Sequence, residues 1–209
     1  MAASTLDWVI DADTHISEPP DLFTNRLPRK WHDVAPKIVK NEETGFENWV
    51  IGPKQQTSTP VGHTAVAGWP EPFPAAPSGF SEIPQAAHDP HARLEYMDSL
   101  RIWAMALYPN VSGFGSQAFL NLEDPELMLA CVRAYKDFLT DWCAPARERF
   151  IPITSIPFWD VAASTPIVRS RRIEIGSARR DQTSANCWSM ISRSKNSAAP
   201  PGGRAASSP

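Results

Sequence analysis

Cysteine is scarce in this chain of 209 residues, and the three that occur, Cys131, Cys143 and Cys187, have no Cys-x-x-Cys spacing. An odd number without that spacing argues against a disulfide framework and against a thiolate metal site, so we expect reduced thiols. No apolar run approaches the roughly 18 residues that a membrane-spanning helix needs. The first residues also lack a basic patch followed by a hydrophobic stretch, which argues against a secretory signal. We therefore expect a cytoplasmic protein without a membrane partner.

Charge is distributed unevenly along the chain. Residues 1–162 carry 12 Lys and Arg against 21 Asp and Glu, a net charge of -9, whereas residues 163–209 carry 8 against 2, a net charge of +6. A basic, Ser-rich tail can bind nucleic acid, but Trp188 is the only aromatic residue in it, so we expect no nucleic-acid partner. The sequence therefore predicts a globular part over 1–162 and a basic, low-complexity tail over 163–209. The tail is expected to be disordered because it cannot bury enough apolar surface to offset its ordering entropy.

The change of pattern at the start of this tail is abrupt. A helix is expected after Asp160, but hydrophobic periodicity disappears and Ser and Arg dominate. A shift of the reading frame near residues 163–166 would explain both the charge reversal and the loss of pattern, the tail then being out-of-frame translation.

Strands and helices alternate along the globular part. The apolar patterns and the Asp-Pro helix starts predict a strand over 7–13, a helix from Asp89-Pro90 to Leu100 with an apolar face of Leu94, Met97 and Leu100, a strand over 102–108 buried on both faces, a helix from Asp124-Pro125 until Pro145, and a strand over 150–158. This order predicts an α/β fold with right-handed crossovers and a parallel sheet, either doubly wound or part of a barrel.

The segment from residue 40 to residue 87 interrupts this alternation. It is dense in Pro, Gly and Thr and has scattered aromatic residues but no sustained period, apart from one expected hairpin near 47–51. Long loops in compact domains are commonly functional covers. The segment is therefore interpreted as an insertion that either folds over a pocket or is poorly ordered.

Carboxylates and one imidazole gather at the end of the first strand. Because successive side chains of a strand alternate between faces, Asp11, Asp13 and His15 are expected to share one face, so Asp13 and His15 can reach one ion. Such a ligand pair suits zinc, manganese or iron, although two ligands do not complete a site. Asp11 could accept a hydrogen bond in a second shell or simply bond to the backbone. Glu18 could orient His15 from a second shell or belong only to the Glu-Pro-Pro turn, which we favour.

Three segments together resemble the amidohydrolase-2 family, which includes aminocarboxymuconate-semialdehyde decarboxylase. They read Asp11-Ala-Asp-Thr-His-Ile-Ser-Glu-Pro-Pro, Asp89-Pro-His-Ala-Arg-Leu-Glu-Tyr-Met-Asp and Arg149-Phe-Ile-Pro-Ile-Thr-Ser-Ile-Pro, within a match over residues 5–163. The resemblance implies the N-terminal portion of a (β/α)8 TIM barrel of the metal-dependent hydrolase type, truncated after about three strands. Asp13 and His15 match two ligand positions, although many members have His-x-His there. The family's remaining ligands come from later strands, which this chain lacks.

The resemblance also implies a function and a cofactor. The expected activity is nonoxidative decarboxylation, by a carboxy-lyase, or hydrolysis of a small aromatic or unsaturated carboxylate, with a divalent metal ion that is zinc in preference to manganese or iron. A homodimer is implied for the full-length form. No residue can be assigned as catalytic acid or base, because the family takes these from later strands. The alternative is a catalytically incompetent, truncated fragment of such an enzyme.

Overall fold

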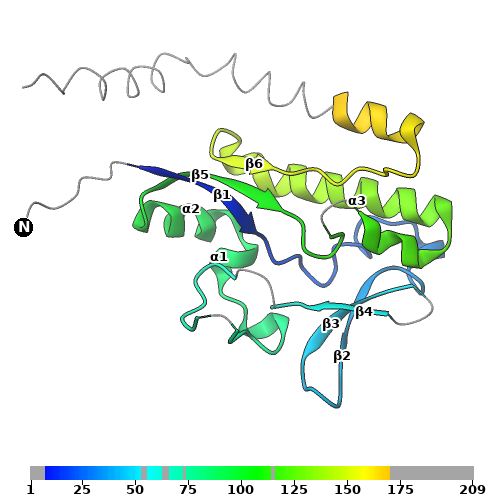
Figure 1. The fold of residues 1–209 in the computed structure, drawn as a ribbon, viewed down its shortest axis with the longest axis horizontal. Coiled ribbons are helices and arrows are strands. Elements are labelled where there is room, and N and C mark those ends of the chain that lie inside the picture. The colour runs from blue at the N-terminus through cyan, green and yellow to red at the C-terminus, as the bar shows by residue number, and fades with distance from the viewer. Residues whose placement is uncertain (1–7, 53–55, 63–65, 73, 114–115, 170–209) are drawn as a thin grey trace, which may run out of the picture. The chain divides into compact units, whose positions relative to one another are not determined.

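The structure is a computed structural model that describes residues 8–52, 56–62, 66–72, 74–113 and 116–169. All of them belong to a compact unit over residues 1–171. One three-stranded sheet, in the order β1-β5-β6, consists of β1 (Val9–His15), β5 (Ile102–Tyr108) and β6 (Phe150–Pro152), and its two pairs of strands are parallel. A second sheet, in the order β2-β3-β4, consists of β2 (Lys37–Lys40), β3 (Glu47–Ile51) and β4 (Gln56–Pro60), and it is antiparallel (Figure 1).

The first sheet confirms the predicted parallel arrangement. Helix α2 (Pro90–Ser99) precedes β5, and helix α3 (Pro125–Cys143) connects β5 to β6, as the Asp-Pro starts indicated. The strand expected over 7–13 runs instead from Val9 to His15, and the third strand is shorter than predicted. β5 is not buried on both faces, since Trp103 remains 38% exposed. The remaining short helices are α1 (Gln85–His88) and the 3-10 helices Arg29–Trp31, Phe80–Glu82, Gln117–Leu122 and Ala144–Ala146.

Helix α2 begins as predicted but buries a different face. Asp89 is the N-cap, and its Oδ1 accepts a hydrogen bond from the backbone N–H of Ala92 at 2.8 Å. The buried side chains are Arg93 and Met97, one helical turn apart, whereas Leu100 is 50% exposed. The expected apolar face of Leu94, Met97 and Leu100 was therefore wrong in part, because the tertiary contacts of Arg93 bring a charged side chain to the buried side.

Helix α3 contributes more buried side chains to the core than any other described helix. Asp124 Oδ1 accepts backbone N–H groups of Glu126 at 2.9 Å and Leu127 at 3.2 Å, and Pro125 occupies the first helical turn. Side chains three and four positions apart turn inward, as the sequence pattern predicted: Leu127, Met128, Cys131, Val132, Ala134, Tyr135, Phe138, Leu139, Trp142 and Cys143.

The segment over 40–87 is more regular than its composition indicated. The predicted hairpin near 47–51 is part of a three-stranded sheet, in which β3 pairs with both β2 and β4. Phe23 packs edge-to-face against Trp49 of this sheet, with ring centroids 5.8 Å apart, and against Phe119, at 5.9 Å. Gly52 has φ +87°, and a Cβ there would lie 1.9 Å from the carbonyl oxygen of Asn121. Glycine therefore permits the close approach of this sheet to the segment before α3.

Order continues past the predicted start of the tail. Residues 161–169 are helical, the Asp160 Oδ1 accepts the backbone N–H of Ala163 at 2.9 Å, and Ile167 is buried. The expectation of disorder from residue 163 was thus wrong for 163–169, where a local cap and one buried side chain support a helix. Residues 170–209, the rest of the predicted tail, lie outside the described residues. Among the described helices, none combines the length and the apolar character that crossing a membrane requires.

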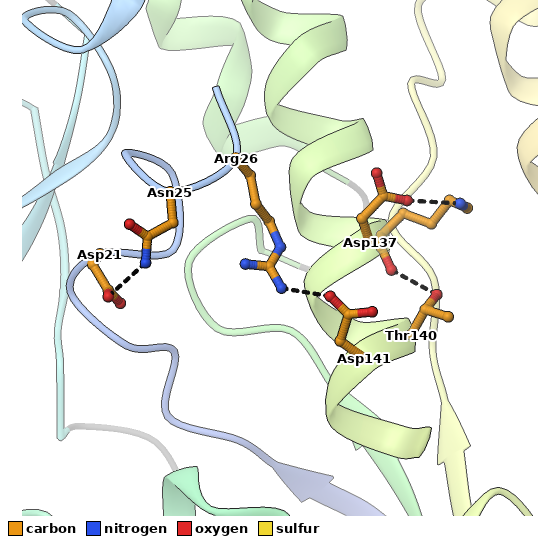
Figure 2. Close-up of polar contacts among 7 residues, drawn as sticks. Asp21, Asn25, Arg26, Asp137, Thr140 and Asp141 are labelled. Atoms are coloured by element: carbon orange, nitrogen blue, oxygen red, sulfur yellow. Dashed lines mark hydrogen bonds and ion pairs between the residues drawn. The ribbon is translucent and has the colours of Figure 1, made fainter. Parts of the chain in front are cut away.

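Polar contacts join the segment after β1 to the outer side of α3 (Figure 2). Arg26 Nη2 donates to Asp141 Oδ2 at 2.7 Å, and within the segment Asn25 Nδ2 donates to Asp21 Oδ2 at 2.7 Å. Asp141 is largely exposed to solvent, so we expect this ion pair to contribute no more than about 1 kcal/mol.

Candidate functional site

A register irregularity in β1 decides where the candidate ligands point. Asp11 pairs with Met105 of β5, while His15 pairs with Tyr108, and the register shifts between Asp11 and Thr14. Met105 and Tyr108 are three positions apart on β5, so alternation places their side chains on opposite faces of the sheet. Asp11 and His15 therefore do not share a face, contrary to the expectation from regular alternation.

A local hydrogen bond accompanies this irregularity. The backbone N–H of Asp13 donates to Asp11 Oδ1 at 3.1 Å, which is the side-chain-to-backbone contact by which Asp commonly competes with a strand ladder. An extra residue in one strand of a pair bends it locally and redirects the side chains that follow. Of the two alternatives for Asp11, the structure therefore has the backbone contact.

His15 lies at the carboxyl end of β1 and is half-buried. Its Nδ1 is buried and has no hydrogen-bond partner among the described residues, and its ring lies 6.0 Å from the ring of Tyr108. Desolvation lowers the pKa of His15, and the nearby Asp13 carboxylate, followed by the backbone of Tyr108, the side chain of Asn110 and the backbone of Pro109, offsets part of this effect. The imidazole is therefore neutral at pH 7, which is the form that binds a metal ion.

Asp13 and His15 fit two positions of a metal site. Asp13 is exposed and lies close enough to His15 to influence its pKa, and the buried, partnerless Nδ1 offers a lone pair in the tautomer that carries its proton on Nε2. A carboxylate oxygen and an imidazole nitrogen are ligands that zinc, manganese and iron accept. Within the part of the chain that the structure describes, no group of three or more His, Cys, Asp or Glu side chains is placed to hold a metal. A metal site at this pair would therefore need further ligands.

Glu18 is buried and is not an ordinary turn residue. Its Oε1 accepts the backbone N–H groups of Asn110 at 2.8 Å and Val111 at 3.2 Å and the hydroxyl group of Tyr135 at 3.0 Å. Burial raises the pKa of Glu18 to about 7, although the hydrogen bonds to the carboxylate oppose this effect. The Glu18 carboxyl group therefore joins the turn after β1 to the loop after β5 and to α3, which neither sequence-based interpretation anticipated.

The end of β1 is also held by residues that were not singled out from the sequence. Asn110 Nδ2 donates to the carbonyl oxygen of Ile16 at 2.8 Å, and the backbone N–H of Ser17 donates to the carbonyl of Ala87 at 2.8 Å. Arg93 Nη2 donates to the carbonyl oxygen of His15 at 3.0 Å. Asn110 follows β5, at the sheet edge where ligands commonly bind in parallel α/β sheets. Its position in the sequence could therefore have marked it as a candidate site residue. Arg93 gave no such signal, because its partner at the end of β1, the carbonyl of His15, lies 78 residues away in sequence.

The loops after β5 and β6 also meet. Ser112 Oγ and Ser155 Oγ lie 2.7 Å apart, and both side chains are buried. Three carboxyl-terminal strand ends are therefore connected: β1 to β5 through Glu18 and Asn110, and β5 to β6 through this serine pair. In parallel α/β sheets, ligands bind at this edge.

A cavity of about 370 Å³ adjoins β1. Asp11 and Asp13 line it on the strand side, Trp69 and Tyr96 contribute aromatic walls, and His15 is not among the lining residues. Because the imidazole does not face this cavity, we place the candidate metal position at the Asp13 and His15 pair and not at the cavity's centre.

The other histidines remain local. His32 Nε2 lies 2.9 Å from the carbonyl oxygen of Leu27, the ring of His88 packs 5.0 Å from that of Phe80, and His91 is exposed. His63 lies outside the described residues. None of these three described histidines joins the Asp13 and His15 pair in a group of three or more potential ligands.

Comparison with known proteins supports a fold relationship. No family model and no curated protein matches the sequence. Thirteen chains of solved structures match. One is the crystal structure of an amidohydrolase from Mycobacterium avium subsp. paratuberculosis K-10, which is 21% identical with a TM-score of 0.58, over 79% of this chain and 47% of that one. The chain thus has an amidohydrolase-like fold and spans about half the length of this solved structure.

Proposed function

We propose that the chain is the N-terminal portion of a (β/α)8 barrel of the metal-dependent amidohydrolase type, in which Asp13 and His15 are metal ligands. The observation that carries the proposal is the buried, partnerless Nδ1 of His15 beside the Asp13 carboxylate, at the carboxyl end of the first parallel strand. Active sites of (β/α)8 barrels lie at this end of the strands. The amidohydrolase-like fold supports the same interpretation.

The proposed reaction is nonoxidative decarboxylation of a small aromatic or unsaturated carboxylate, similar to that of aminocarboxymuconate-semialdehyde decarboxylase, with hydrolysis as the other chemistry of such barrels. A bound divalent ion, with zinc preferred over manganese or iron, would supply Lewis-acid polarisation of a substrate oxygen. This chain's own contribution is to hold and orient that ion. Asp13 supplies an anionic oxygen and His15 supplies a neutral nitrogen. Arg93 and Asn110 bind the carbonyls of His15 and Ile16 and so restrain the two successive peptide groups that follow the His15 Cα.

A second candidate is a catalytically incompetent fragment of such an enzyme. The described residues form a parallel sheet of three strands and supply two of the ligands that a complete catalytic site needs. A frame shift near residues 163–166 would place any later strands in another reading frame. In this case the pair should bind a metal ion weakly and without turnover.

Metal titration of the purified full chain tests both candidates. We expect calorimetry to show that Co²⁺ or Zn²⁺ binds at one site. Asp13→Ala and His15→Ala should each abolish that binding. His91→Ala, which removes an exposed imidazole from α2, is the matched control and should leave the titration unchanged. Binding that survives both site substitutions would refute the ligand assignment. Tight, stoichiometric binding would favour the enzyme, and weak binding would favour the fragment.

A further inference from the structure

Arg93 is a buried cation whose recorded hydrogen bonds do not reach a carboxylate. Its side chain has no exposed surface and is the largest of the fully buried side chains described. Nε donates to the carbonyl oxygen of Ala86, and Nη2 donates to the carbonyl oxygens of His15 at 3.0 Å and Ala87 at 3.4 Å. Nη1 lies 3.5 Å from the sulfur of Met105. The guanidinium therefore contacts three backbone carbonyls and a thioether, and its Cζ also lies 5.8 Å from the centroid of the Trp142 ring.

Such a side chain is unfavourable as simple core filling. Desolvation lowers the pKa of Arg93 to about 10, although the nearby Tyr96 and the Asp11 carboxylate oppose this effect. The group therefore remains charged at pH 7, and the part of the burial cost that these neighbours do not offset persists. An apolar side chain of similar volume would fill this space without that cost. The planar guanidinium, however, can donate to several acceptors at once in a fixed geometry, which neither an apolar side chain nor lysine can do.

The three carbonyls belong to two segments that meet at the candidate site. His15 ends β1, and Ala86 and Ala87 lie in α1, at the end of the long segment between β1 and α2. The backbone N–H of Ser17 also donates to the carbonyl of Ala87, which reinforces the same junction. Arg93 thus connects the last residue of β1 and helix α1 from within α2.

We propose that Arg93 is a positioning residue: by binding the His15 carbonyl together with those of Ala86 and Ala87, it fixes the backbone from which the candidate ligand projects. This inference rests on the proposed function for its consequence, since the positioned group is a proposed metal ligand. It assigns to Arg93 no contact with the ion or with substrate. The part of the inference that concerns the His15 backbone stands independently of any metal.

Arg149 provides a matched control for a lysine substitution. It too binds backbone carbonyls, with Nε donating to Trp103 at 2.9 Å and Nη2 to Ile102 at 2.9 Å, and it also pairs with Asp98 at 2.7 Å. These contacts lie at the amino end of β5, whereas His15 lies opposite Tyr108 at the carboxyl end. Arg149→Lys therefore removes the same kind of fork from the opposite end of the sheet.

The test compares Arg93→Lys with Arg149→Lys in the full chain. We expect Arg93→Lys to shift the NMR signals of the His15 carbonyl carbon and imidazole, and to weaken Co²⁺ binding by about tenfold or more, as losses around metal ligands typically do. Arg149→Lys should change neither quantity, even where it lowers thermal stability equally. A folded Arg93→Lys protein with the His15 signals of the wild type would overturn the proposal. Absence of Co²⁺ binding by the wild type would refute the proposed function alone, since the NMR comparison requires no metal.

If Arg93→Lys does not fold, hydrogen exchange of the wild-type protein tests the same proposal. The guanidinium protons of Arg93 should exchange slowly with solvent because they are buried and hydrogen-bonded to the three carbonyls. Rapid exchange of these protons in the folded protein would contradict the proposed clamp, and slow exchange would support it.

Discussion

Replacing Glu18 by glutamine tests whether one buried carboxyl group makes the stability of this fold depend on pH. The Glu18 side chain is 2% exposed and its pKa is raised from 4.5 to about 7, chiefly by desolvation. A raised folded-state pKa means that the folded protein binds this proton more tightly than the unfolded chain does. Its contribution to stability is therefore fully present below pH 4.5 and is lost as the pH rises to about 7.

The magnitude follows from the same values. At roughly 1.4 kcal/mol per pH unit, the interval from 4.5 to about 7 amounts to about 3 kcal/mol. Glutamine is neutral at every pH and keeps an oxygen that can accept hydrogen bonds from Asn110, Val111 and Tyr135. The free energy of unfolding of Glu18→Gln minus that of the wild type should accordingly increase by about 3 kcal/mol between pH 4.5 and pH 7.5.

Urea denaturation followed by tryptophan fluorescence at several pH values measures this difference. Groups that titrate in both proteins, such as His15, cancel in the subtraction, and any cost of seating the amide is a constant offset. Glu95→Gln, an exposed carboxyl on α2, is the control and should give a difference that does not vary with pH. A difference for Glu18→Gln that is equally flat would refute the reasoning, because it would mean that the buried carboxyl titrates as it does in the unfolded chain.

Two other predictions concern local structure and the reading frame. Asp124→Ala should destabilise the fold by about 1 kcal/mol, because two backbone N–H groups of α3 lose their acceptor; urea denaturation checks this, and an Asp124→Asn variant should retain most of the stability. Sequencing the source DNA across codons 155–175 should reveal an inserted or deleted base, with histidine- and aspartate-bearing strands continuing in another frame. An intact frame there would refute the frame-shift hypothesis.

Local patterns were sufficient to predict most of the parallel unit. The strand over 102–108 and the starts of α2 and α3 agree with prediction because apolar runs, Asp caps and Pro at the first helical position act within a few residues. The antiparallel sheet was predicted only in part, since its pairing depends on contacts such as that of Phe23 with Trp49. Helix 161–169 was missed for a similar reason: Ile167 is its one buried residue, and the other residues of the segment, Val161 and Val168 included, are exposed or only partly buried.

The sequence by itself determined that carboxylates and one imidazole follow an apolar strand and that strands alternate with capped helices. These features depend on residue type and spacing, which a chain carries into any conformation. Only the tertiary structure decided that Asp11 and His15 face opposite sides of the sheet, because a bulge depends on pairing with β5. It alone also decided the burial of Glu18 and Arg93, whose partners lie up to 117 residues away. Burial and hydrogen bonding between distant segments arise only when the chain has folded, and they determine the charge and the geometry of the candidate site.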